Sequence, residues 1–116
     1  MNRLVALVSA GAVALSTSGS TWAGSGPELA PAQIAAAKTA ADHEAIARAY
    51  EQEAADLESK AALHQSMKDA YRFPSRPAGV KQSIHCAAIV KDLQAAAKES
   101  RALAAAHRQW AKDAAK

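Results

Sequence analysis

The sequence predicts an all-α fold, an antiparallel two-helix hairpin of the Ala-rich coiled-coil type, and three observations support this. Two columns of residues repeat at every seventh position, one on each side of a segment with prolines at 74 and 77. Alanine is the commonest residue, with 33 among 116. Residues 42–72 contain no Gly or Pro, and no stretch shows the strict alternation of a strand.

The two columns predict the register of the hairpin, because residue numbers that face each other across an antiparallel pair have a constant sum. Four pairs of mixed residue types sum to 150: His43/His107, Tyr50/Ser100, Leu57/Leu93 and His64/Cys86. Four pairs of small residues sum to 151: Ala40/Ala111, Ala47/Ala104, Ala54/Ala97 and Ala61/Val90. The two sets agree on one register, with an alanine-lined seam that lets the two backbones approach closely.

Residues 1–23 have the features of a secretory signal peptide. Asn2 and Arg3 provide a short positive start, residues 4–15 form an apolar run of 12, and Thr21-Trp22-Ala23 is a small-x-small cleavage site. The run is short for a membrane span, so we expect no stable span after cleavage; the alternative is an uncleaved N-terminal anchor. We therefore expect an exported, periplasmic protein.

A lead segment over residues 24–38 precedes the first long helix. Pro31 suits a first helical position, where its missing N–H has no helical partner to lose. Thr39 followed by Asp42 is a capping-box pattern. The first long helix is therefore expected to start, or to restart, at residue 39 and to span about 39–72.

The turn of the hairpin is expected at residues 73–79. Pro74 ends the first helix, because the residue before a proline disfavours the helical conformation, and Pro77 can open the second. The second helix is expected over about 80–114, so that the hairpin occupies residues 39–116.

Charge is divided unevenly between the two halves of the hairpin. Residues 28–72 carry five Lys/Arg and eight Asp/Glu, net −3, whereas residues 73–116 carry eight and three, net +5. Opposite net charges favour docking of the two helices, and Glu44–Arg48 and Asp56–Lys60 are favourable i,i+4 pairs within the first. The pI of 9.2 on its own suggests nucleic acid. Because the basic residues are diffuse and export is expected, no nucleic-acid partner is predicted.

Large apolar side chains are sparse after residue 23, so one hairpin alone buries little core. Either it dimerises into a four-helix bundle, or another device such as a bound metal holds it together. We expect self-association, and the sequence identifies no other protein partner. The apolar faces are mostly alanine, which argues against binding to a membrane surface.

The turn end of the seam brings four metal-ligating residue types close together. His64 faces Cys86, Met67 lies one helical turn beyond His64, and His85 flanks the seam. Imidazole, thiolate and thioether form a soft set that suits copper(I), with zinc second. The alternative is that Met67 and Cys86 fill the core while His64 hydrogen-bonds across the seam. A single Cys in an oxidising compartment is expected to be buried, metal-bound or in an intermolecular disulfide.

The open end of the seam has His43 facing His107, with Glu44 adjacent and Trp110 one turn along. Two imidazoles supply half of a structural zinc site, and a second hairpin in a dimer could supply the other half. The alternative is a His–His pair that binds no metal, is shielded by Trp110 and is in contact with solvent at the helix ends.

Catalysis finds weak support in the sequence. Cys86 with His64 or His85 has the residue types of a nucleophile and its base. A simple hairpin, however, has no concave pocket and no third orienting group. The sequence therefore predicts a non-catalytic protein that binds or buffers a soft metal, copper before zinc; the alternative is a metal-free structural or adaptor hairpin that acts by self-association or partner binding.

A set of short motifs spans residues 42–112. They are His43-Glu44, Tyr50-Glu51, Ala54-Ala55, His64-x-x-Met67, Tyr71, His85-Cys86, Leu93, Ala96-Ala97 and His107-Arg108. The set resembles small uncharacterised Ala-rich exported proteins of proteobacteria. This resemblance implies an exported helical hairpin and no particular activity, so the metal hypothesis rests on the residues alone.

Overall fold

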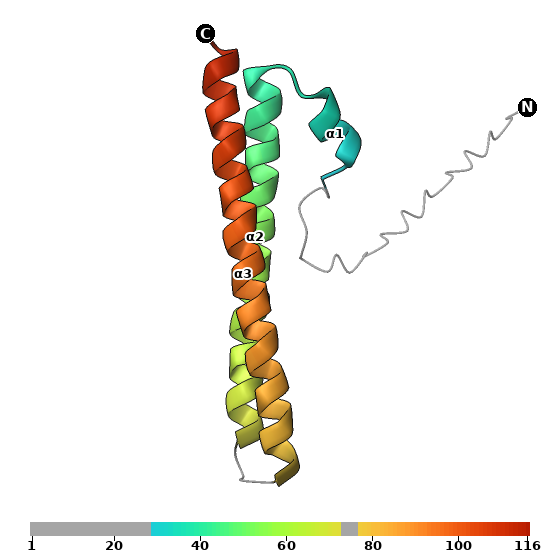
Figure 1. Cartoon of the computed structure of the whole chain (residues 1–116), viewed down its shortest axis with the longest axis vertical. Helices are drawn as coiled ribbons and strands as arrows, with labels where there is room; N and C mark the ends of the chain where they lie inside the picture. Colours follow the sequence, from blue (N-terminus) through green and yellow to red (C-terminus); the bar gives the residue numbers. More distant parts are fainter. Residues whose placement is uncertain (1–28, 73–76) are drawn as a thin grey trace, which may run out of the picture.

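The computed structural model describes residues 29–72 and 77–116, and all regular structure in these residues is α-helical. The elements are α1 (Pro31–Ala36), α2 (Ala40–Arg72) and α3 (Pro77–Ala114). The long helices α2 and α3 pack side by side, and the short α1 lies next to the first half of α2 (Figure 1). The all-α class and the pair of long helices are confirmed.

The predicted signal peptide, the predicted turn and the predicted start of the second helix can each be compared with the residues that the structure describes. The predicted signal peptide, residues 1–23, lies outside them, as do residues 73–76 of the predicted turn. Within residues 29–72 and 77–116, no helix combines the length and the apolar content needed to cross a membrane. The second long helix begins earlier than expected, at Pro77, because proline is well tolerated at a first helical position.

The chain both starts a helix in the lead segment and restarts at residue 40. In α1, Pro31 is at the first position, and the side chain of Gln33 accepts a hydrogen bond from the backbone N–H of Ala30 at 3.0 Å. At α2 the capping box is reciprocal: Thr39 Oγ1 accepts from the Asp42 N–H at 3.1 Å, and Asp42 Oδ2 accepts from the Thr39 N–H at 2.9 Å. The expected cap at Thr39 is confirmed.

The interface between α2 and α3 is built from alanine. Six alanines in this interface are at most 4% exposed: Ala47, Ala54 and Ala61 on α2, and Ala97, Ala104 and Ala111 on α3. These are members of the predicted column whose numbers sum to 151. Among the described residues, Ile46 is the only buried large aliphatic side chain. Small side chains at every layer let the helices lie close, but they bury little apolar area.

Contacts across the interface join early residues of α2 to late residues of α3, as in the pairs His43–His107 and Glu51–Arg108. The two ribbons run in opposite directions in Figure 1. Within residues 29–72 and 77–116, two inter-helix ion pairs connect a Glu of α2 to an Arg of α3, namely Glu51–Arg108 and Glu58–Arg101. Neither of the expected pairs, Glu44–Arg48 and Asp56–Lys60, is an ion pair in the part of the chain that the structure describes, so this expectation was wrong. Asp56 instead accepts a hydrogen bond from Gln52 at 3.0 Å, one turn earlier on the same helix.

Candidate functional site

The open end of the seam holds a direct contact between two histidines. The Nδ1 atoms of His43 and His107 lie 3.1 Å apart, although 64 positions separate the residues in sequence. Since both atoms are ring nitrogens, one of them carries the hydrogen that it donates to the other. His107 is 3% exposed, whereas His43 is half-buried. The structure therefore brings together the two residues predicted to face each other here.

Aromatic rings surround this histidine pair. Trp110 presents an edge-to-face contact to both imidazoles, with centroid separations of 4.8 Å to His107 and 5.7 Å to His43. Tyr50 also neighbours His107, with a centroid separation of 5.9 Å. Tyr50 was predicted only as a member of the register column and not as part of this cluster. Its position one heptad after His43 was the available signal.

The electrostatics of the open end disfavour a charged His107. Burial lowers the pKa of His107, and the neighbouring His43 lowers it further by charge repulsion. The adjacent Arg108 forms an ion pair with Glu51, and the hydrogen bond that its guanidinium donates lowers the pKa of the Glu51 carboxyl. Neutral imidazoles with available lone pairs are the form that binds a metal ion.

At the turn end of the seam, only some of the predicted metal ligands are buried. Cys86 is a free thiol and is buried, and His64 is half-buried. The Nδ1 atom of His64 is buried and makes no hydrogen bond to the Cys86 thiol or to any other described group. Met67 is 38% exposed, and the His85 side chain is exposed as well. The inner members of this cluster are therefore His64 and Cys86.

Within the described ranges, no three His, Cys, Asp or Glu side chains gather closely enough to hold a metal ion together. The structure thus does not bring His64, His85 and Cys86 into one three-ligand group. His85 precedes Cys86 by one residue, and one residue of an α-helix corresponds to a rotation of about 100°. This rotation turns the His85 side chain away from the seam. The predicted soft-metal site remains a prediction that depends on His64, Cys86 and Met67.

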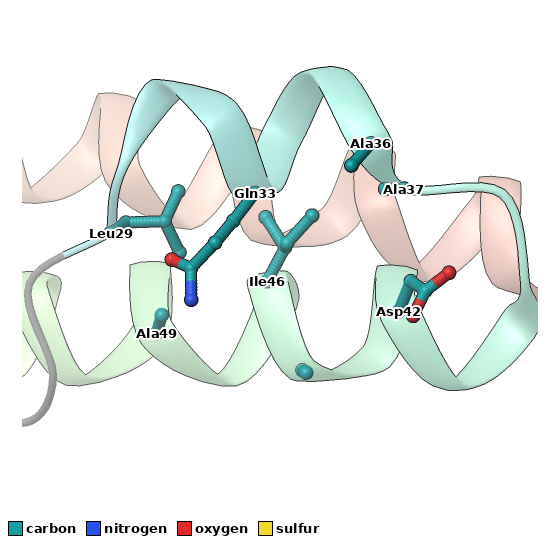
Figure 2. A pocket seen from close by; sticks show the side chains of 8 residues that line it. Leu29, Gln33, Ala36, Ala37, Asp42, Ile46 and Ala49 are labelled. Carbon is teal, nitrogen blue, oxygen red and sulfur yellow. The ribbon is translucent and has the colours of Figure 1, made fainter.

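A shallow groove of about 350 Å³ lies between α1 and α2 (Figure 2). Its lining is mostly small and apolar: Leu29, Gln33, Ala36, Ala37, Asp42, Ala45, Ile46 and Ala49. The two polar side chains in it already cap helices, because Gln33 accepts from Ala30 and Asp42 accepts from Lys38 and Thr39. The polar groups of the groove are therefore already paired, and its lining contains no His, Cys or Ser.

A second feature, which the analysis of the sequence missed, is a stripe of apolar side chains outside the seam. Leu103 and Trp110 follow Arg101 and Arg108 by two residues, about 200° around α3, and so lie on the flank opposite the ion pairs. We call the apolar flank the set of exposed side chains Ile89, Leu103 and Trp110 of α3 with Met67 of α2, which are 38–51% exposed. The spacing of seven or fourteen residues along α3 was the available signal.

Comparison with known proteins gives no relative on which to base an assignment. No protein-family model, no curated protein and no solved structure matches the chain.

Proposed function

We propose that this protein is a non-catalytic, exported helical hairpin that acts by self-association, with two copies packing their apolar flanks together into a four-helix bundle. The observation that carries the proposal is the inversion of the usual pattern of burial. The seam between α2 and α3 is alanine, whereas the large side chains of the apolar flank are partly exposed. Stable monomers rarely leave an organised row of large apolar side chains in water.

The spacing of the apolar flank supports a helical partner. Ile89, Ala96, Leu103 and Trp110 are separated by seven residues each, which is the repeat of a coiled coil. The seam uses a different set of heptad positions, so α3 carries two apolar rows on adjacent sides. A helix with two such rows packs against two neighbours, as the helices of a four-helix bundle do.

The charges favour a second copy of this chain as the partner. Helix α2 contains four basic and seven acidic residues, net −3, and α3 contains six basic and three acidic residues, net +3. When two copies pack with the acidic helix of each beside the basic helix of the other, unlike charges alternate around the bundle. The charges of the two helices cancel within each copy, so the hairpins do not repel each other.

The oligomeric state of the exported protein tests this proposal. Light scattering coupled to size-exclusion chromatography is expected to give the mass of a dimer for the wild type and of a monomer for Leu103→Glu, which places a charge in the middle of the apolar flank. Ala102→Glu is the matched control, because Ala102 is exposed and lies one residue away, on the outer face of α3. A monomeric wild type at about 100 μM, or an equal effect of both substitutions, would refute the proposal. Fractionation of the producing cells tests the periplasmic location.

A second candidate function is binding or buffering of a soft metal, copper before zinc, at the turn end of the seam. It is favoured by the buried Nδ1 atom of His64, which lacks a hydrogen-bond partner although buried polar atoms are nearly always paired. Cys86 supplies a buried thiol and Met67 a thioether to the same set. Metal analysis of untagged protein from the periplasm tests it: stoichiometric copper or zinc that is lost in Cys86→Ser supports the site, and metal-free protein rejects it.

A further inference from the structure

We propose that His43 and His107 together chelate one divalent first-row transition-metal ion, with copper(II) bound most tightly. The site is at the opposite end of the seam from His64 and Cys86, and it uses two imidazoles from one hairpin. It therefore depends neither on the soft-metal site nor on self-association.

The separation of the two nitrogens matches the requirement of a chelate. Metal–imidazole bonds are about 2.0–2.1 Å long. With the Nδ1 atoms 3.1 Å apart, a metal at that distance from both subtends an angle of about 95–102°. This value lies between the angles of square-planar and tetrahedral coordination. Copper(II) favours tetragonal sites with nitrogen and oxygen ligands, so water can complete the shell.

The packing around the pair holds the rings in place before a metal arrives. The His107 ring contacts Trp110, at 4.8 Å, and Tyr50, at 5.9 Å, and is almost completely buried. Rings that are already oriented lose little conformational entropy on binding. His43 is half-buried, so the ion can enter and keep its water ligands on that side.

The hydrogen bond between the rings does not prevent chelation. In a neutral imidazole the single N–H can be on either nitrogen, so the ring that donates from Nδ1 can carry its hydrogen on Nε2 instead. Both Nδ1 lone pairs then face the ion, and no net proton is released. A rotation of the less buried His43 ring then exchanges the hydrogen bond for two metal bonds.

The site is tested by titration of the metal-free, exported protein with copper(II) chloride at pH 7.5. Isothermal calorimetry measures the affinity, and electron paramagnetic resonance reports the ligands. We expect one copper(II) per chain bound at this site, with hyperfine coupling to imidazole nitrogen. His43→Gln and His107→Gln are each expected to weaken binding by at least about tenfold, because even outer partners of metal ligands contribute that much. The matched control His85→Gln, at an exposed histidine outside both candidate sites, is expected to leave the affinity unchanged.

Two outcomes would overturn the proposal: unchanged affinity in His43→Gln, or an equal loss in His85→Gln. His43→Gln carries the test if His107→Gln fails to fold, because His43 is the less buried partner. Circular dichroism establishes that each variant is helical. The mass of the protein, measured with and without copper, separates this site from self-association: a monomer that binds copper through His43 retains this proposal and rejects the other.

Discussion

Replacement of one seam alanine by leucine tests whether close approach of α2 and α3 holds the hairpin together. Ala54 is fully buried, and the facing Ala97 is 2% exposed. Leucine adds three carbon atoms at a layer where neither helix has a larger side chain. The added atoms can be accommodated only if the helices move apart, and this separates the neighbouring layers at Ala47 and Ala61 as well.

The size of the effect follows from two opposing terms. A buried leucine side chain in a site that fits it gains about 1.5–3 kcal/mol relative to an exposed one. At Ala54 the space is absent, and insertion of extra carbons into a well-packed interior instead costs about 1–3 kcal/mol. We expect Ala54→Leu to lower the free energy of unfolding by that amount. Ala55→Leu, on the adjacent exposed position, is expected to change it by less than about 0.5 kcal/mol.

Urea unfolding followed by circular dichroism at 222 nm measures both variants against the wild type. The slope of the unfolding free energy against urea is expected to be unchanged, since it reports the surface exposed on unfolding. Equal stability of Ala54→Leu and Ala55→Leu, or a gain in stability for Ala54→Leu alone, would show that the seam has room for larger side chains. The close-packed alanine interface would then be wrong.

Three further predictions concern the sites and the cap. Because the pKa of His107 is lowered in the folded protein, the unfolded chain binds more protons at low pH; stability is therefore full above about pH 6.5 and is lost as the pH falls below it. Two imidazolium charges 5.4 Å apart repel by about 1–3 kcal/mol. In thermal melts from pH 8 to 5, the wild type is therefore expected to lose more stability, by about this amount, than the His43→Gln, His107→Gln double variant. Equal losses of stability in the two proteins would show that the pair is exposed to solvent. Cys86 is expected to react slowly with thiol reagents in the native protein and quickly in urea, and fast native labelling or a disulfide-linked dimer would contradict its burial. Thr39→Ala is expected to cost about 1 kcal/mol in urea unfolding through loss of the α2 cap, whereas the exposed Ser59→Ala should cost little; equal effects would show that the cap contributes nothing.

Several features of the fold could be predicted from the sequence alone because helical periodicity fixes the angular position of each residue. The column of alanines spaced by seven identified the buried face of both helices. The same arithmetic paired His43 with His107, and these side chains are in contact. The cap at Thr39 was predictable because a capping box depends only on residues three positions apart.

Other features were decided by the tertiary structure, because atoms within one layer meet only if rotamers and inter-helix distance allow it. His64 and Cys86 share a layer by number, yet His64 Nδ1 makes no hydrogen bond to the thiol. The acidic residues Glu51 and Glu58 pair with arginines of the opposite helix, a choice that composition alone left open. The alanine seam is also the reason that the large side chains of the apolar flank lie outside: the layers of buried alanine leave no space for a larger side chain.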